Sequence, residues 1–176
     1  WSVNKNGSIQ VLEPKDPALL RAGDATAKLF AKGLGDHDLK QLESLLAHPD
    51  QRVRKLAQFQ LVERGPKGKS ILLQVAQAQD ASLVARLHAL WGLGQLGRKG
   101  KSDVKALIGL LNDSDDEVRA NAARVVGDLR LKEARDALLS LLEDKSLRVR
   151  SLAAIALGRA CKRGDEEVIA SLYQTA

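Results

Sequence analysis

The side chains in this sequence that could do chemistry are few and widely spaced. There is one cysteine, Cys161, and the three histidines are His37, His48 and His88. A single cysteine can form neither an internal disulfide nor a cysteine-based zinc site. None of the histidines has a second ligand at the spacing of a dedicated metal site, and His37 lies between two aspartates near an expected helix start, which favours a capping or solvated role. The residues therefore predict no bound metal.

Motifs for nucleophilic catalysis and for cofactor binding are also missing. The sequence contains no G-x-S-x-G nucleophile elbow. The stretch nearest to a phosphate-binding loop, residues 65–70 (GPKGKS), has misplaced glycines and no preceding strand, so we interpret it as a loop between repeats. Cys161 is followed by Lys162, Arg163 and Gly164 and does not complete the C-x-x-C-H motif that attaches a c-type haem. These observations predict a chain without a cofactor and without an active site.

The elements that position these side chains form an internal repeat of about 32 residues. Residues 48–65, 80–97, 113–130 and 144–161 superimpose on one arginine in each copy. An alanine follows this arginine after three residues, and a glycine follows after eight in three of the copies. An aspartate precedes it by six residues in three copies, and His48 takes that place in the other. The aligned arginines are Arg54, Arg86, Arg119 and Arg150, and the aspartates are Asp80, Asp113 and Asp144.

Each copy has the pattern of two helices joined by an Asp- or Ser-rich turn, which suits the capping of a helix N-terminus. Leu39, Leu42 and Leu46 recur at helical spacing before such a turn, and Val118 and Ala122 do so after one. The sequence therefore predicts an all-α fold, a right-handed α-α superhelix of about four hairpins. We expect a solenoid over 21–176, with repeats at 36–65, 68–97, 102–130 and 133–163 and a partial last helix at 165–174. A helix at 24–33 is expected to cap it, and residues 1–20 are expected to be extended, with one short strand at 7–12.

The repeated unit resembles the HEAT-repeat family, whose second helix opens on a Val-Arg pair. Val53-Arg54, Val118-Arg119 and Val149-Arg150 fit that signature, whereas the second unit departs from it with Ala85-Arg86. The resemblance covers about residues 35–176. It implies ladders of aspartate and arginine between successive repeats, with Asp80, Asp113 and Asp144 facing Arg86, Arg119 and Arg150. The alternative is that these arginines are simply solvated.

Residues 48–65 and 85–97 resemble more particularly the HEAT segment of large exported proteins of planctomycete-type bacteria, which are membrane-bound dehydrogenase or haem-binding proteins. In that family a β-propeller precedes the helices and a cytochrome c domain often follows. The stretch at 6–16 would then be the last strand leaving the propeller. The resemblance implies a spacer between redox domains in a periplasmic or extracytoplasmic protein, with neighbouring domains as its partners.

Trp91 is the residue with the sharpest alternative roles. With Leu87 and Leu90 it forms an apolar flank apart from the main core stripe of its helix, and the matching positions in the other copies hold Phe59, Arg124 and Ile155. This flank either fills the seam between neighbouring second helices or forms a patch that docks a partner. His88 has the same two alternatives. The candidate partner-binding residues are therefore Phe59, His88, Trp91 and Arg124.

The charged residues separate along the repeat. The net charge is +6, and cations collect after each second helix (Arg64, Lys67, Lys69; Arg98, Lys99, Lys101; Arg130, Lys132; Lys162, Arg163) while acids collect in the turns before it. Helix dipoles alone would favour this placement, and a basic edge that binds nucleic acid or an anionic membrane surface is the alternative.

Taken together, these observations predict a monomeric, non-catalytic scaffold that binds proteins, because long stacked surfaces favour extended partners over catalysis. The alternative is a nucleic-acid-binding HEAT-like protein of the DNA-alkylation-repair glycosylase type. A HEAT protein of the lyase type that handles a tetrapyrrole is a third possibility, although no residues dedicated to it are found. No run of the sequence has the length and apolarity of a membrane span.

Overall fold

The computed structural model describes residues 2–3, 9–10, 15–100, 104–162 and 164–174. The chain divides into two compact units, an N-terminal unit, Trp1–Asp36, and a C-terminal unit, His37–Ala176. This division lies sixteen residues beyond the boundary at residue 20 that the sequence suggested, because a helix occupies much of the intervening stretch.

The described residues of the N-terminal unit form two paired strands of two residues each and one helix. Strand β1 (Ser2–Val3) pairs antiparallel with β2 (Ile9–Gln10), with Ser2 opposite Gln10. The expected strand over residues 7–12 is described only at Ile9–Gln10, and it pairs with Ser2–Val3 of the same chain. Helix α1 runs over Pro17–Lys32. It begins well before the expected residue 24, because the Asp16 carboxylate accepts the backbone N–H of Ala18 at 2.8 Å and Pro17 suits the first helical position.

The C-terminal unit is built from helices. The helices are α2 (Leu39–Leu45), α3 (Gln51–Glu63), α4 (Pro66–Gln77), α5 (Leu83–Arg98), α6 (Val104–Gly109), α7 (Asp116–Asp128), α8 (Arg135–Ser140), α9 (Leu147–Ala160) and α10 (Glu166–Gln174), with short 3₁₀ turns η1 (Leu110–Asn112), η2 (Lys132–Ala134) and η3 (Leu141–Glu143). Each expected repeat range holds one hairpin, although α4 begins at Pro66, ahead of residue 68, and the expected start at residue 102 lies outside the described residues.

Polar side chains before the helices define where they start. The Asp38 carboxylate accepts the N–H of Gln41 at 2.8 Å while the Gln41 side chain accepts the N–H of Asp38 at 2.9 Å, which is a reciprocal capping box. The Asp115 carboxylate accepts the N–H groups of Glu117 and Val118 at the start of α7. These caps satisfy backbone donors that have no partner inside the helix.

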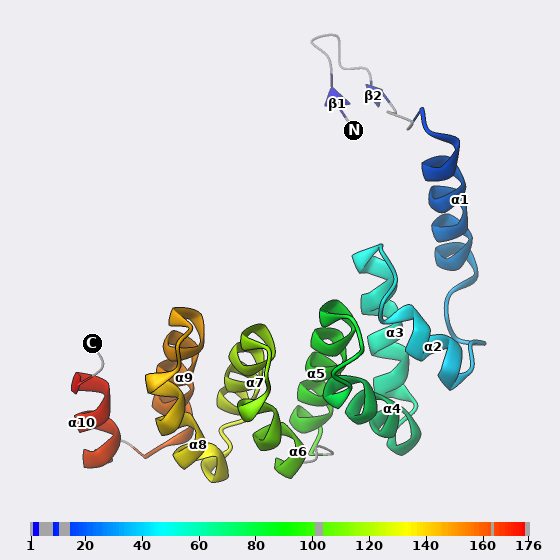
Figure 1. The fold of residues 1–176 in the computed structure, drawn as a ribbon. Coiled ribbons are helices and arrows are strands. Elements are labelled where there is room, and N and C mark those ends of the chain that lie inside the picture. The colour runs from blue at the N-terminus through cyan, green and yellow to red at the C-terminus, as the bar shows by residue number, and fades with distance from the viewer. Residues whose placement is uncertain (1, 4–8, 11–14, 101–103, 163, 175–176) are drawn as a thin grey trace. The chain divides into compact units, whose positions relative to one another are not determined.

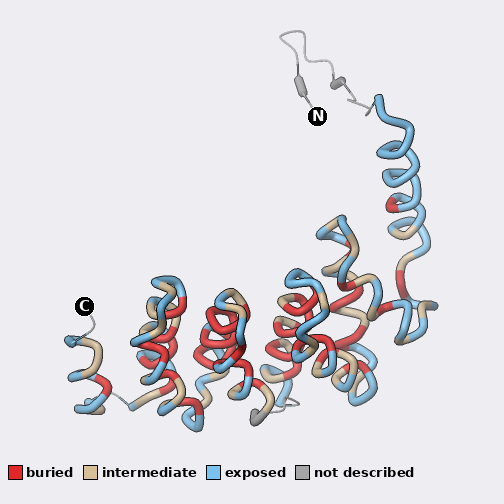
Figure 2. Tube along the Cα trace, in the orientation of Figure 1, coloured by how far each residue is buried: buried red, intermediate tan, exposed pale blue. Residues whose placement is uncertain are grey.

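Figure 1 shows how the hairpins of the C-terminal unit follow one another in chain order from α2 to α10. The second helices α3, α5, α7 and α9 pack side by side, each against the next, and the first helices α2, α4, α6 and α8 pack against their own second helices. Leucine, valine and alanine side chains fill the layer between them, with Leu42, Leu61, Leu93 and Leu138 fully buried (Figure 2). The C-terminal unit is therefore an all-α solenoid. In the part of the chain that the structure describes, no helix combines the length and apolarity needed to cross a bilayer.

Close approach of neighbouring second helices requires glycine at one aligned position. A Cβ atom on Gly127 of α7 would lie 2.7 Å from both Cα and Cβ of Ala156 in α9. The equivalent residue of α9, Gly158, has no atom within 4 Å of such a Cβ. The same glycine in the repeat therefore has a packing role in one helix and none in the other.

We predict opposite effects for the two Gly→Ala changes. Gly158→Ala should raise the free energy of unfolding by up to about 1 kcal/mol, because alanine loses less conformational entropy in a helix. Gly127→Ala should lower it by about 1–3 kcal/mol, because the added methyl group forces the two helices apart. Urea unfolding followed by circular dichroism measures both values. Equal effects of the two changes would contradict the assigned packing role of Gly127.

Candidate protein-docking face

The exposed sides of α3, α5, α7 and α9 form one surface of the C-terminal unit, called here the second-helix face. Two kinds of interaction connect these helices beneath it. Buried ion pairs join their N-terminal ends, and a chain of aromatic and amide side chains joins their middles. The first kind holds the repeats in register, and the second positions the side chains that a partner would meet.

The first buried ion pair joins Arg86 of α5 to Asp113, which stands in the turn before α7. Both side chains are only 4% exposed. The Arg86 guanidinium also donates to the carbonyl of Ala76 at 3.1 Å, and the Asp113 carboxylate also accepts the N–H of Asp115 at 2.9 Å. One carboxylate thus stabilises a buried cation of one repeat and the turn of the next.

A second pair repeats the arrangement one hairpin later. Arg119 of α7 donates from Nε and Nη2 to the two carboxylate oxygens of Asp144, at 2.8 and 3.0 Å, and each side chain is 9% exposed. Arg119 also donates to the carbonyl of Asp113 at 2.8 Å, and Asp144 accepts the N–H of Ser146 at 2.8 Å. A bidentate guanidinium–carboxylate pair specifies geometry as well as charge.

Of the aspartates and arginines expected to form a ladder between repeats, Asp113 pairs with Arg86 and Asp144 pairs with Arg119. Arg119 and Arg150 each reach only the backbone carbonyl of the aspartate six residues before them, because that carboxylate already points to the arginine of the preceding repeat. Arg86 pairs with Asp113 of the following repeat, and Asp80 is exposed. The two ion pairs therefore join successive repeats, and Asp80 is not part of the ladder.

The first repeat lacks this ion pair. Arg54 donates to the carbonyls of His48 and Pro49 at 2.6 and 2.8 Å, and among the described residues no carboxylate lies within ion-pair distance of it. His48 replaces the aspartate only in part, since its Nδ1 accepts the N–H of Asp50 at 3.0 Å. The Arg-Asp ladder therefore has two ion pairs, both in the later repeats.

The pKa values of both ladder carboxylates are lowered from the usual value for aspartate. Burial alone would raise the pKa of Asp113, but the hydrogen bonds from Arg86, from the backbone of Asp115 and from Gln79 outweigh it and bring the pKa below its usual value. The hydrogen bond from Arg119 lowers the pKa of Asp144, against a smaller effect of burial. Both groups are therefore charged at neutral pH.

A second set of contacts crosses the middles of the helices. His88 of α5 is buried, and its Nδ1–H donates to the side-chain carbonyl of Gln58 in α3 at 2.8 Å. Its ring lies edge-on to Trp91, with centroids 4.9 Å apart, and the Trp91 Nε1–H donates to Asn121 of α7 at 3.1 Å. Asn121 in turn donates to the carbonyl of Glu117 at 2.8 Å. This polar chain spans three second helices and fixes the orientation of the indole ring.

Of the four candidate partner-binding residues, three lie on the surface. Phe59 and Trp91 are half-buried and Arg124 is exposed, whereas His88 is buried behind Trp91 and orients it. Trp91 therefore combines features of both alternatives. Its indole N–H bonds across the seam to Asn121, and its side chain also lines a surface pocket. The role of these residues in binding a partner stays a prediction.

Gln58 and Asn121 were not singled out by the sequence analysis. His88 and Asn121 stand two residues after the aligned arginine, where the other copies hold Leu56 and Leu152. Two of the four copies hold leucine at this position, so a polar residue there was the sequence signal that could have pointed to Asn121. Gln58 gave no such signal, because its role depends on the packing of α3 against α5.

Three shallow pockets follow one another along the second-helix face. One of about 310 Å³ lies between α3 and α5, one of about 320 Å³ between α5 and α7, and one of about 620 Å³ between α7 and α9. Arg98 lines the first two and Arg124 the last two. Aromatic rings and guanidinium groups are therefore available at successive seams.

Acidic and basic side chains alternate on this face. Arg124 lies 4.0 Å from Asp128, which also pairs with Arg159 of α9. Arg148 of α9 pairs with Glu117 of α7 at 2.9 Å. The Asp128–Arg159 and Glu117–Arg148 pairs bridge α7 and α9 at the surface. Chemically, such a face can stack apolar groups on its aromatic rings and bind carboxylates, but among the described residues no group of three or more His, Cys, Asp and Glu side chains is placed to hold a metal ion.

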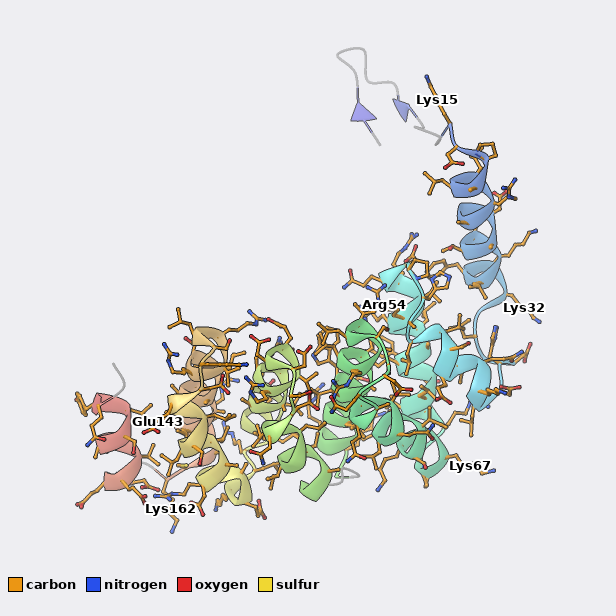
Figure 3. All side chains as sticks on the ribbon, viewed as in Figure 1. Lys15, Lys32, Arg54, Lys67, Glu143 and Lys162 are labelled. Atoms are coloured by element: carbon orange, nitrogen blue, oxygen red, sulfur yellow. The ribbon has the colours of Figure 1, made fainter. Side chains whose placement is uncertain are left out.

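Most of the cations expected to form a basic edge are exposed where the structure describes them, and Lys69 is half-buried. Lys67 and Lys162 point away from the stack along the same margin in Figure 3. Lys101 and Arg163 lie outside the described residues. Among the acidic residues of the turns, Asp113 and Asp144 are buried in the ladder. Binding of an anionic partner by the basic edge stays a prediction.

Comparison with known proteins identifies the repeat. Residues 104–176 match a family model described as HEAT repeats. The preceding HEAT-like hairpins, α2–α3 and α4–α5, continue the same stack. The chain is thus a scaffold-like protein of helical repeats.

Two relatives come from the same organism. Over 92 residues the chain is 36% identical to the phycocyanobilin lyase subunit alpha of Nostoc sp. strain PCC 7120, an alignment that covers 48% of this chain and 33% of that protein. A chain from the complex of CpcE and CpcF of phycocyanin lyase from Nostoc sp. PCC 7120 superimposes with a TM-score of 0.55 at 21% identity, over 77% of this chain and 57% of that one. The structural likeness shows the shared fold. The chain spans about a third of the length of its sequence relative.

The expectation that this chain is not an enzyme is wrong, because the sequence relative is a lyase subunit. The sequence left a lyase-type HEAT protein only as a third possibility, because it contains no recognisable catalytic motif, cofactor motif or set of metal ligands. The resemblance to planctomycete-type exported dehydrogenases, with the spacer role and the extracytoplasmic location that it implies, stays a prediction.

The ladder predicts a large difference between aspartates that look equivalent in the sequence. Asp144→Asn should lower the free energy of unfolding by about 3 kcal/mol or more, because it leaves the buried Arg119 without a counter-charge. Asp80→Asn should change it by less than about 0.5 kcal/mol, because Asp80 is exposed. Urea unfolding at neutral pH measures both. Similar small effects would mean that the buried pair does not hold the repeats together.

His88 predicts a pH dependence of stability. Burial, aided by the charge of Arg54, lowers its pKa to about 4. Because the unfolded state takes up a proton near pH 6.5 and the folded state does not, the stabilising contribution is complete above that pH and is lost as the pH falls toward 4. Between about pH 7 and pH 5 the wild type should lose about 2 kcal/mol more than His88→Gln. Denaturant unfolding at the two pH values tests this, and equal losses would contradict it.

Proposed function

We propose that this chain is a protein-binding subunit of a lyase-type complex and that it holds its protein partner on the second-helix face. The lyase assignment is supported by the 36% identity to the alpha subunit of phycocyanobilin lyase. The name of that relative indicates an enzyme assembled from more than one subunit. In the structural relative a protein of this fold occurs in a complex of CpcE and CpcF.

The observation that carries the docking proposal is the arrangement of partly exposed apolar residues on the second-helix face. Trp91 lines the pocket between α5 and α7, and Phe59 lines the pocket between α3 and α5. On α9, Leu147 is 73% and Ile155 is 50% exposed. Apolar and aromatic side chains at successive seams, with arginines between them, have the composition of a protein interface.

The rigid support beneath the face favours the same role. Trp91 is held by His88 and Asn121, so its ring needs little further ordering when a partner binds. The ladder pairs Arg86–Asp113 and Arg119–Asp144 keep the three later second helices in register. We infer that substrate chemistry occurs in the assembled complex, with this chain as the scaffold that positions the partner.

Complex formation with CpcF of Nostoc sp. PCC 7120 tests the proposal. Size-exclusion chromatography with light scattering should show a complex when the purified chain and CpcF are mixed at tens of micromolar, with CpcE as the positive control. Trp91→Ala should weaken this complex by about tenfold or more. Tyr173→Ala is the matched control, because Tyr173 is an exposed aromatic residue on α10, away from the second helices.

Separate elution of the chain and CpcF, under conditions in which CpcE forms its complex, would count against the lyase assignment. An equal effect of Trp91→Ala and Tyr173→Ala would count against the second-helix face. Circular dichroism and urea unfolding of each variant establish that it is folded, which matters because Trp91 also contributes to the packing of α5 against α7.

A further inference from the structure

The cations of the second-helix face differ in how well their charge is satisfied within the chain. Arg148 and Arg159 each have a carboxylate within hydrogen-bonding distance. Arg124, whose side chain is 62% exposed, is 4.0 Å from Asp128 and shares that carboxylate with Arg159. Across the ranges that the structure describes, no carboxylate lies within ion-pair distance of Arg98 or Lys99. Arg98 and Lys99 at the C-terminal part of α5 therefore carry positive charge that no carboxylate of the described residues neutralises, and Arg124 shares its carboxylate with another arginine.

This charge lies beside the aromatic residues. Arg98 and Arg124 both line the pocket of about 320 Å³ whose wall includes Trp91. Arg98 and Lys99 also line the neighbouring pocket that includes Phe59. The two pockets, one lined by Trp91 and the other by Phe59, therefore share the guanidinium group of Arg98. A ligand that fits them carries negative groups and apolar groups in alternation.

The face also contains carboxylates that limit what can bind. Glu63 lines the pocket between α3 and α5, and Asp128 lines the one between α5 and α7. A nucleic-acid backbone has uniformly spaced negative charges and would meet these carboxylates as well as the arginines. A peptide can place its carboxylates only where the cations are. The alternation of signs therefore favours a peptide over a nucleic acid.

We infer that the docking segment of the partner is an acidic peptide in which carboxylates alternate with apolar side chains. Its carboxylates pair with Arg98 and Arg124, and an apolar side chain between them packs on Trp91. Neighbouring helices lie about 8–10 Å apart and an extended chain rises about 3.3 Å per residue, so such a segment crosses one repeat in about three residues. This inference rests on the proposed function, because it names the partner's chemistry at the same face.

Fluorescence anisotropy with defined probes tests the inference. The first probe is a labelled peptide of four Asp-Leu-Glu units, the second its amide counterpart of Asn-Leu-Gln units, and the third a labelled single-stranded DNA of twelve nucleotides. We expect saturable binding of the acidic peptide, about tenfold weaker binding of the amide peptide, and no saturable binding of the DNA. The Nε1–H signal of Trp91 in a nitrogen–proton correlation spectrum should shift on titration with the acidic peptide, with Trp1→Phe to assign it.

The matched variants separate a specific site from general attraction. The double variant Arg98→Glu/Arg124→Glu should bind the acidic peptide at least about tenfold more weakly. The double variant Lys67→Glu/Lys132→Glu makes the same change in net charge at exposed lysines away from the pockets and should bind it within about twofold of the wild type. No saturable binding, equal losses in the two double variants, or a preference for the DNA would each overturn the inference.

The complex with CpcF distinguishes failure of this inference from failure of the proposed function. If the complex is weakened by Trp91→Ala but not by Arg98→Glu/Arg124→Glu, the proposed docking face is supported and the inference of an acidic segment is rejected. If the acidic peptide binds at Trp91 but no complex with CpcF forms, the peptide site is supported and the proposed lyase partner is rejected.

Discussion

The structure of the C-terminal unit depends on how the buried arginines at the starts of α5 and α7 are neutralised. A guanidinium group removed from water is stabilised only if a carboxylate reaches it with good geometry. Arg86 and Arg119 each find that carboxylate in the turn of the following repeat, and the same carboxylate caps that turn. Because one aspartate meets both needs, the next hairpin can dock in only one register.

This fixed register makes the second-helix face a defined surface. Contacts that cross the seams, such as those from His88 to Gln58 and from Trp91 to Asn121, require side chains about 30 residues apart to meet at hydrogen-bonding distance. Glycine at position 127 allows α7 and α9 to approach closely enough for surface pairs such as Arg148–Glu117. The aromatic and cationic groups offered to a partner are therefore set by the packing beneath them.

A scaffold of helical repeats can position protein partners in an enzyme that assembles from several chains. Its likeness to a lyase subunit covers part of the chain and about a third of the relative, and the second-helix face is the surface that we propose for protein docking. In such an assembly the repeat protein supplies position and specificity, while the residues that meet the substrate need not carry a motif that a single sequence reveals. This explains why a search for catalytic motifs led to the wrong expectation about enzymatic association.

The sequence by itself determined the solenoid, because the periodic leucines and alanines and the aspartates at turns are local patterns that specify helices and their ends. It also pointed to Phe59, Trp91 and Arg124 as one aligned position. It failed at residues 17–23, where an early proline and the Asp16 cap extend the helix. Only the tertiary structure decided that Arg86 pairs with Asp113 rather than Asp80, that His88 is buried behind Trp91, and that Gly127 is needed where Gly158 is not. These outcomes depend on distances between helices that are far apart in the chain, and residue order does not specify such distances until the repeats have packed.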